Sequence, residues 1–587
     1  MTLIDELSAI VGEAFAAEGF DCSFGFVRRS DRPDLAQFQC NGALAAAKAA
    51  GKKPQDAAGA IAGRLAAIAA FTKVDVAGPG FINLTLADDF LAERANRLAG
   101  DSRAGAWRRA APERIVIDYG GPNVAKPLHV GHLRSAIIGE SLKRILRSAG
   151  DFVISDIHLG DWGLPMGQLI VELAQERPDL PYFDSGYIGP YPDQSPVTLA
   201  DLERLYPKAA AAAKADPARA EAARLATAQL QEGRPGYRAL WRHFITVSRA
   251  AIEREYADLG VSFDWWKGEA DADPLIPQMA EEMRAKGVVE KSDGAEIIRV
   301  AREGDKKEIP PLILFKSDGS VLYGTTDLAT VLHRKLEARP DRILYVVDQR
   351  QATHFEQVFR AAEIAGIFPA DRLEHVGFGT MNGKDGKPFK TREGGVLRLR
   401  DLIDMVEARA RERLREGGFA EGFDETEVGD IARKVGVAAL KFADLSNPRT
   451  SDYIFDLDRF IAFEGRTGPY LQYAVVRVRS VMRKAQAARA GAPGAIVIAA
   501  AEERDLALAL LGFGDALRLA HEKRMPHFLC DHAFGLAQAF SKFYAACRIA
   551  DEPDLARRAS RLGLASVAAK QLEAALELLG ISVPDRM

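Results

Sequence analysis

The chain has 587 residues, of which 48% are hydrophobic and 27% charged, and its net charge at neutral pH is −4. This length exceeds what a single hydrophobic core supports, and the composition is that of an ordinary globular protein, so we expect several domains. The small negative charge excludes a uniformly basic surface, so any nucleic-acid contact must come from local positive patches. No apolar run is long enough to span a bilayer, and we expect a cytoplasmic monomer without a membrane partner.

The four cysteines give no sign of a covalent framework or of a metal site. They form no Cys-x-x-Cys pair and have no histidines at zinc-finger spacing, so we expect no disulfides, no structural zinc and no other protein-held metal. The sequence favours four buried thiols: Cys22, Cys40, Cys530 and Cys547.

Residues 1 to about 110 predict a small α/β domain of their own. Helical periodicity near the start and over residues 54–70 is followed by VDVAGPGFINLTL, which is typical of a strand and a turn. The polar segment GDSRAGAWRRAAPE then predicts a solvated linker.

Residues 114–143 predict a buried parallel strand, a turn and a helix. The β-branched run Ile115–Ile117 leads into a turn built on Gly120, Gly121 and Pro122. A helix is expected to open near His129, because apolar side chains then recur at steps of three and four residues. These side chains are Leu133, Ile137, Ile138, Leu142 and Ile145.

The first turn of this helix carries His129-Val130-Gly131-His132. Two imidazoles three residues apart lie on one side of a helix N-terminus, beside unpaired N–H groups and the positive end of the dipole, and Gly131 lets a ligand approach the backbone. Such a site suits polyphosphate, because histidine can hydrogen-bond a phosphoryl oxygen without a permanent charge. The alternative is a chance match or a quartet that fills a core.

The segment DYGGPNVAKPLHVGHLRSAIIG, residues 118–139, resembles the first signature of class I aminoacyl-tRNA synthetases, specifically of arginyl-tRNA synthetases. The resemblance extends over nearly the whole chain. It implies an arginine–tRNA ligase that uses ATP, with its Mg²⁺, to activate L-arginine as arginyl-adenylate. The arginyl group then passes to the 3′-terminal ribose of tRNA(Arg), and AMP and pyrophosphate are released. His129, Gly131 and His132 would bind the ATP phosphates, and His129 and His132 would be catalytic.

The resemblance also implies an arginine pocket. Asp118 and Asp327 match the family's acidic positions, where a paired carboxylate gives a guanidinium a fork that lysine cannot match. Tyr323 would close the side-chain pocket, while Asn123 and Gln351 match the positions that hold the substrate's α-amino group. The alternative for Asp118 is a helix cap or an internal salt bridge.

From residue 112 to about 380, strands and helices alternate as in a doubly wound, Rossmann-like catalytic domain with a parallel sheet. An Ala-rich tract predicts a helical insertion over about 180–260. Gln349, Gln351 and His354 follow an expected strand, at the edge where such sheets hold ligands. Two departures from the family stand out: Gly120-Gly121 replaces a Ser-Ser pair, and Leu164-Pro165-Met166 stands where Thr-Gln-Phe is common.

Residues 381–460 are expected to hold a signature loop and connecting helices. The Gly- and Lys-rich segment 378–399 predicts a mobile loop able to neutralise departing pyrophosphate. It resembles the family's Lys-Met-Ser-Lys-Ser signature, but Pro388-Phe389-Lys390-Thr391-Arg392 stands in its place. The resemblance gives ATP contacts to Lys390 and Arg392 and a catalytic role to Lys390, and our hypothesis is that Lys126 supplies part of the charge missing at Thr391. The alternative is a merely solvated lysine cluster.

Residues 461–587 predict an all-α domain, which the resemblance makes the anticodon-binding domain. Residues 465–501 contain no acidic side chain, which predicts a basic helical surface suited to a phosphate backbone, although a solvated face is the alternative. The resemblance implies tRNA contacts by Tyr544 and Met587 here, and by Phe81 and Asn83 in the N-terminal domain, where an aromatic ring can stack on an unpaired base. Alternatively, Phe81 and Tyr544 are core residues and Asn83 caps a turn.

Two other functions stay open at this level. The same strand and His-x-Gly-His helix serve small-molecule nucleotidyltransferases, whose chains are much shorter and lack a basic helical C-terminus. The altered second signature also allows a non-catalytic tRNA-binding paralogue. Arginine-dependent pyrophosphate exchange, measured with and without tRNA, separates these functions.

Overall fold

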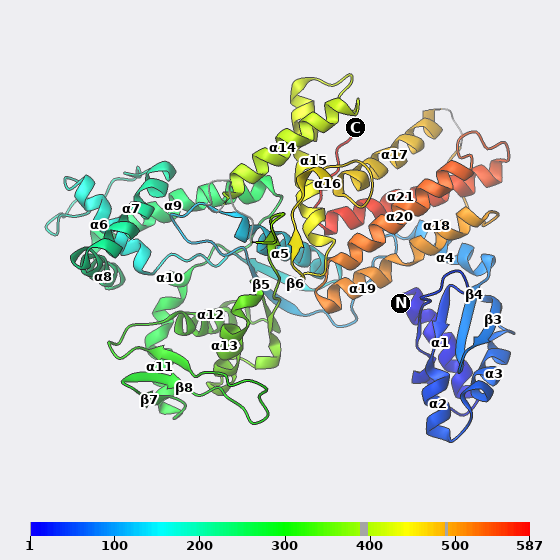
Figure 1. Cartoon of the computed structure of the whole chain (residues 1–587), viewed down its shortest axis with the longest axis horizontal. Helices are drawn as coiled ribbons and strands as arrows, with labels where there is room; N and C mark the ends of the chain where they lie inside the picture. The colour runs from blue at the N-terminus through cyan, green and yellow to red at the C-terminus, as the bar shows by residue number, and fades with distance from the viewer. Residues whose placement is uncertain (1, 388–396, 488–490) are drawn as a thin grey trace. The chain divides into compact units, whose positions relative to one another are not determined.

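The computed structural model describes residues 2–387, 397–487 and 491–587, and the chain separates into two compact units (Figure 1). The first unit comprises Met1–Ala110, Glu412–Phe442 and Arg459–Met587. The second unit comprises Ala111–Arg411 and Ala443–Asp458. Lys390, Thr391 and Arg392, on which the second-signature prediction rests, lie outside the described residues.

The first unit opens with a four-stranded antiparallel sheet in the order β1-β2-β4-β3, packed on helices through a core that includes Leu7, Phe15 and Leu84. The predicted α/β character is confirmed, and the segment expected as a strand and turn proves to be two paired strands, β3 and β4. The elements are α1 (Leu3–Ala17), η1 (Cys22–Gly25), β1 (Val27–Arg29), β2 (Phe38–Cys40), α2 (Gly42–Ala50), α3 (Pro54–Leu65), β3 (Phe71–Ala77), β4 (Phe81–Leu86) and α4 (Asp88–Gly100).

The rest of the first unit is helical, as the sequence predicts. Its helices α17 and α21 pack along each other, and α20 packs against both. The expectation of four buried thiols was wrong for one of them: Cys22 is exposed because it opens a surface 3-10 helix, whereas the other three are buried. The helices are α17 (Gly468–Ala487), α18 (Ala501–Leu511), α19 (Phe513–Lys523), α20 (His527–Ala546) and α21 (Leu555–Leu578), together with most of α15 (Glu425–Leu445).

The second unit is built on a four-stranded sheet in the order β11-β10-β5-β6. All three strand pairs are parallel, which confirms the predicted doubly wound sheet. Helices α5, α12 and α13 cover it. Their apolar stripes follow the predicted spacing, as Leu133, Ile137 and Leu142 of α5 show by their complete burial. The bounds are β5 (Arg114–Tyr119), α5 (Val130–Ser148), β6 (Phe152–Asp156), α12 (Tyr323–Ala338), β10 (Arg342–Val346), η3 (Gln349–Gln351), α13 (Ala352–Ile364), η4 (Ala370–Arg372) and β11 (Leu373–His375).

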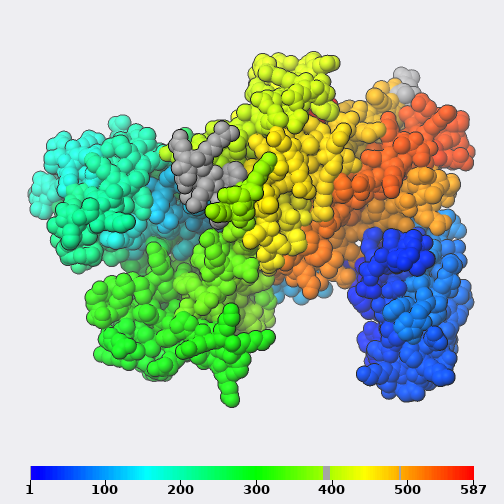
Figure 2. Space-filling model, viewed as in Figure 1, coloured from blue at the N-terminus to red at the C-terminus, as the bar shows by residue number. Residues whose placement is uncertain are grey.

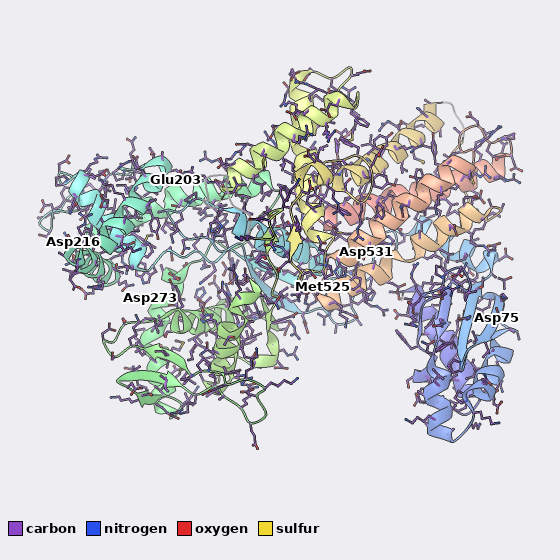
Figure 3. All side chains as sticks on the ribbon, viewed as in Figure 1. Asp75, Glu203, Asp216, Asp273, Met525 and Asp531 are labelled. Atoms are coloured by element: carbon purple, nitrogen blue, oxygen red, sulfur yellow. The ribbon has the colours of Figure 1, made fainter. Side chains whose placement is uncertain are left out.

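Four helices interrupt the alternation after β6 and form one lobe (Figures 1 and 2). Asp216, labelled in Figure 3, lies between the second and the third of these helices. It caps the third by accepting a hydrogen bond from Ala218 N. The lobe is held together mainly by packing of its first helix on the next two. These helices are α6 (Leu164–Glu176), α7 (Leu199–Ala215), α8 (Pro217–Gln231) and α9 (Pro235–Asp258).

A smaller antiparallel sheet, β7-β8-β9, and a two-stranded parallel pair, β12 with β13, complete the second unit. None of the helices described is both long enough and apolar enough to cross a membrane. The remaining elements are α10 (Glu269–Ala272), η2 (Asp273–Leu275), α11 (Ile276–Ala285), β7 (Glu290–Ser292), β8 (Ala295–Ile298), β9 (Leu312–Phe315), β12 (Met381–Asn382), α14 (Leu399–Glu416), β13 (Tyr453–Ile454) and α16 (Leu457–Phe460), of which α14, like α15 and α16, runs from one unit's residues into the other's.

Candidate functional site

The carboxyl edge of the parallel sheet gathers most of the polar residues singled out in the sequence. The strand register places Asp118 of β5 between Tyr345 of β10 and Asp156 of β6. Ligands of open α/β sheets bind at this edge, in the crevice where the strand order reverses. The candidate site therefore includes these three side chains.

Gly120 begins the turn between β5 and α5 and explains one departure from the family. Its φ is +79°, a conformation that residues with side chains rarely adopt. A Cβ here would also lie 3.1 Å from the Tyr256 hydroxyl and the Phe263 ring. The amide of Gly120 donates to Ser135 Oγ at 2.8 Å, and Tyr256 donates to its carbonyl at 2.6 Å. The turn is thus fixed through its backbone, and serine would fit poorly at this position.

His129 forms the N-cap of α5, which begins at Val130, as predicted. Its Nδ1 accepts a hydrogen bond from Gly131 N at 3.0 Å, and Nδ1 of His132 accepts one from His129 N at 3.1 Å. The two rings lie against each other with their centroids 4.0 Å apart and their planes tilted by 38°. A Cβ on Gly131 would lie 2.7 Å from the His129 ring, so this glycine makes room for the imidazole as well as exposing the backbone.

These hydrogen bonds fix the protonation of both imidazoles. A nitrogen that accepts a hydrogen bond cannot carry the ring proton, so in each neutral ring the proton lies on Nε2. Burial lowers the pKa of His132 to about 3, and burial, together with Lys126, lowers the pKa of His129. Both rings are therefore uncharged Nε2–H donors at neutral pH.

Lys126 lies three residues before the first histidine, and its amino group sits 4.6 Å from the centre of the Tyr206 ring. Tyr206 belongs to α7, so the helical lobe takes part in holding this lysine. The cation–π contact keeps the ammonium near the two imidazoles while leaving its three N–H donors available.

The backbone just beyond the undescribed segment 388–396 pairs with the histidine turn. Val130 N donates to Leu397 O at 3.0 Å, and Leu399 N donates to Leu128 O at 2.9 Å. The segment in which we predict Lys390 and Arg392 to act thus joins the described chain directly beside His129.

Asn123 lies exposed in the same turn, beside Gly160. A Cβ on Gly160 would lie 2.4 Å from Asn123 Oδ1, so this glycine, part of the family-like LGDWG segment, is what admits the amide. Gln351 is also exposed, where η3 leads into α13. Both amides are open to a ligand at the sheet's carboxyl edge.

Asp118 is buried and forms an internal ion pair that was an alternative interpretation of the sequence. Its Oδ2 accepts a hydrogen bond from Arg334 Nη2 at 2.6 Å, and the same nitrogen lies 2.7 Å from Asp156 Oδ2. Burial raises the pKa of Asp118, because it outweighs the guanidinium beside it. Burial acts on Asp156 too, but Arg334 and His158 outweigh it there and lower the pKa.

Asp327 lies one turn into α12, where its Oδ2 is 2.6 Å from Nε2 of His354. This hydrogen bond raises the pKa of His354. Tyr323, the first residue of the helix, has 75% of its surface exposed and closes no pocket in this structure.

Arg334 and Asp156 are site residues that the sequence did not single out. Arg334 is the twelfth residue of α12, a helix whose charges suggest a solvated face, and no local pattern marks it as fully buried. Asp156 ends β6, and a polar residue at a strand's carboxyl end was the one available signal. Beyond it, burial raises the pKa of Asp161 to about 7.

The four proposed tRNA contacts all belong to the first unit. Asn83 lies within β4 rather than at a turn, and its Oδ1 accepts a hydrogen bond from Gln39 Nε2 at 3.0 Å. Phe81, the first residue of β4, is half-buried. Tyr544 is also half-buried, under the guanidinium of Arg477 at 4.7 Å, and Met587 is half-exposed at the end of the chain.

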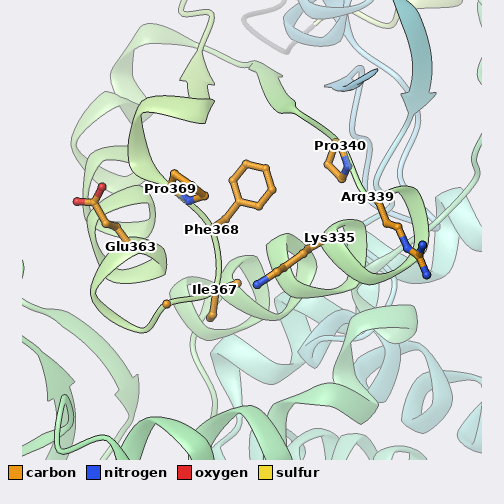
Figure 4. Close-up of a pocket in the computed structure, with 8 residues that line it drawn as sticks. Lys335, Arg339, Pro340, Glu363, Ile367, Phe368 and Pro369 are labelled. Atoms are coloured by element: carbon orange, nitrogen blue, oxygen red, sulfur yellow. The ribbon is translucent and has the colours of Figure 1, made fainter. Parts of the chain in front are cut away.

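A separate pocket of about 570 Å³ lies on the second unit, where Lys335, Phe368 and Pro369 contribute to its lining (Figure 4). It opens near the amino ends of β10 and β11, opposite the edge that carries Asp118, so it is not the candidate site. Within the described ranges no group of three or more His, Cys, Asp or Glu side chains is placed to hold a metal ion.

Three families match successive parts of the chain. Residues 96–457 match the catalytic domain of class I (R) tRNA synthetases, residues 471–587 the DALR anticodon binding domain, and residues 1–86 the arginyl tRNA synthetase N-terminal domain. Two similar relatives are both named arginine–tRNA ligase. That of Hyphomonas neptunium is 58% identical and that of Maricaulis maris 56% identical, and each comparison covers all of both chains.

Solved structures show the same fold. The arginyl-tRNA synthetase of Plasmodium falciparum superposes with a TM-score of 0.82 over 100% of this chain and 99% of its own, at 23% identity. The Thermus thermophilus arginyl-tRNA synthetase gives 0.79 over the whole of both chains, also at 23% identity.

Proposed function

Because the chain belongs to the arginyl-tRNA synthetase family of class I, we propose how its own residues divide the work of an arginine–tRNA ligase. In the first step the carboxylate of arginine attacks the α-phosphorus of ATP, and the bond to pyrophosphate breaks. In the second step the terminal ribose hydroxyl of tRNA attacks the resulting adenylate, and AMP leaves. The first step requires positioning and charge neutralisation rather than a protein nucleophile.

His129 and His132 hold the ATP phosphates in this proposal. Their Nε2–H groups are neutral donors, and a neutral donor can strengthen its hydrogen bond as negative charge builds on a phosphoryl oxygen. The start of α5 adds the positive end of the helix dipole. Mg²⁺ would arrive with the nucleotide, on whose oxygens it prefers to bind.

Lys126, Lys390 and Arg392 would neutralise pyrophosphate as it leaves. Lys126 is held near the histidines by Tyr206, and this position supports its proposed share in the missing charge. Lys390 and Arg392 remain proposals from the family resemblance, because they lie outside the described residues.

Asp118 and Asp327 would bind the arginine guanidinium, and Asn123 and Gln351 its α-amino group. Asp118 keeps 12% of its side-chain surface exposed, enough for one oxygen to meet a ligand. Tyr323 would cover the substrate from the first turn of α12, and its exposure leaves the ring free to do so.

Phe81, Asn83, Tyr544 and Met587 are proposed tRNA contacts. Phe81 could stack on an unpaired base, and Asn83 retains its amide N–H₂ for a base edge although its carbonyl oxygen is occupied by Gln39. We also propose that the enzyme is monomeric and works in the cytoplasm.

The observation that carries the proposal is the pair of adjacent, neutral imidazoles at the start of α5. One turn connects this helix to β5, the strand that carries Asp118. Arginine-dependent exchange of pyrophosphate into ATP tests it. We expect exchange with arginine and tRNA(Arg), and less without tRNA, since the family resemblance implies that activation waits for tRNA. Absence of exchange under both conditions would contradict the proposed roles.

A further inference from the structure

A resident guanidinium occupies part of the site proposed for arginine. Arg334 is completely buried, and its Nη2 binds Asp118 and Asp156 together, at 2.6 and 2.7 Å. Its guanidinium also lies 5.3 Å from the Tyr345 ring. This one side chain therefore contacts all three strands β5, β6 and β10, at the level where their register aligns Asp118 with its two neighbours.

The same helix presents Arg334 and Asp327 to the site. The two residues are seven positions apart, which is close to two helical turns, so both project from one face of α12. Asp327 is proposed to bind the substrate near the start of the helix. The bond from Arg334 to Asp118 thus ties together the two elements, β5 and α12, that carry the substrate's two carboxylates.

The charges in this cluster do not balance. Two buried carboxylates, Asp118 and Asp156, face the single charge of Arg334, which leaves one negative charge. Asp156 is sealed, with 2% of its side-chain surface exposed, against 12% for Asp118. Among the interactions of the described residues, Oδ2 of Asp118 has a hydrogen-bond partner and Oδ1 has none, so Oδ1 is the oxygen left to bind a ligand.

We propose that Arg334 is a positioning and specificity-determining residue, which binds Oδ2 of Asp118 and thereby presents Oδ1, with a net charge of −1, to the guanidinium of the substrate. This inference rests on the proposed function of Asp118. A neutral analogue of arginine would leave that charge unpaired in a buried site, which is costly. Lysine would supply the charge but not a planar fork.

An ordinary structural ion pair is the competing explanation, and a charge-restoring double variant distinguishes the two. Arg334→Met leaves two adjacent buried carboxylates, which must share a proton. Asp156→Asn combined with Arg334→Met removes one of them, so that no proton is shared and Asp118 itself carries the net charge of −1. If Arg334 served only a structural role, removing the second carboxylate would not restore the binding of arginine.

The experiment measures arginine-dependent pyrophosphate exchange by the full-length enzyme with tRNA(Arg), over a range of arginine and ATP concentrations, together with thermal melting. For Arg334→Met we expect the KM for arginine to rise at least about tenfold while the KM for ATP stays unchanged. Its KM for arginine should fall as pH rises, because the shared proton must leave before the guanidinium can bind. The double variant should recover most of the loss, and Arg334→Lys should lie between the two.

Arg360→Met is the matched control, since Arg360 is another buried arginine and is paired with Asp305 at 2.7 and 2.8 Å, away from the sheet edge. It should lower the melting temperature without changing the KM for arginine. A normal KM for arginine in Arg334→Met, or a folded double variant no better than the single one, would overturn the inference. If wild-type enzyme shows no arginine-dependent exchange, the proposed function fails instead. Should Arg334→Met not fold, Arg334→Lys and its pH profile carry the test.

Discussion

The histidine turn (residues 129–132) and the carboxylate cluster (Asp118, Asp156 and Arg334) lie at the same edge of the sheet but differ in charge. At the histidine turn, burial and two backbone hydrogen bonds keep both rings neutral. At the carboxylate cluster, two aspartates lie within hydrogen-bonding distance of one arginine guanidinium. The difference matches what each end would bind: a neutral donor can follow charge that develops during reaction, whereas a permanent cation calls for a fixed anion.

Asp118→Asn should produce the largest effect and confine it to arginine. Removal of one partner from a buried charge pair costs about 2–5 kcal/mol, so kcat/KM for arginine should fall on the order of 10³-fold. Steady-state exchange kinetics with varied arginine and varied ATP measure this, with exposed Asp371→Asn as the control. If affinity for ATP fell equally, Asp118 would not act on arginine alone. The division of the site into an arginine-binding cluster and a phosphate-binding turn would then be wrong.

His129→Asn should act on the rate instead. Asparagine is a good N-cap, so α5 keeps its start, but no donor remains at the position of Nε2. Loss of one such donor costs about 10²–10³ in kcat. Single-turnover adenylate formation should slow accordingly with the KM for arginine unchanged. If His129→Asn bound arginine poorly but formed adenylate at the wild-type rate, the histidine turn would not be the part of the site that binds the phosphates.

The pH dependence of arginine use should depend on His354. Its pKa is raised by Asp327, so below that pKa an imidazolium neutralises the carboxylate, and above it the ring is neutral and Asp327 keeps its charge for the substrate. kcat/KM for arginine should therefore rise with pH through this range, by at most about tenfold per unit for one proton.

His354→Gln should flatten that rise, because an amide does not titrate. The stability that the pair contributes has the opposite sign: it is fully present below the unfolded pKa of about 6.5 and lost as pH rises through the folded value. An unaltered pH profile in His354→Gln would assign the titration to another group.

Lys126→Ala should have the smallest effect and slow adenylate formation about two- to tenfold. The lysine only adds charge beside the imidazoles of His129 and His132, which remain in place to bind the phosphates. Tyr206→Leu should reproduce part of it, since a cation–π contact contributes about 0.5–1 kcal/mol. Lys208→Ala, which removes an exposed lysine that pairs with Glu172 and Glu176, is the control. A wild-type rate in Lys126→Ala would refute its share in the charge.

What the sequence revealed was local, and what it missed depends on distant contacts. The start of α5 at His129 follows from apolar spacing and capping chemistry, and both are properties of adjacent residues. Arg334 depends on partners 178 and 216 positions away, so its helix gives no sign of its burial. The pairing of Asp327 with His354 was likewise hidden, although each was singled out alone.

Residues 128–130 and 397–399 are joined by main-chain hydrogen bonds. An attachment of this kind is indifferent to side-chain identity, so substitutions in the adjoining segment need not disturb the turn that bears His129.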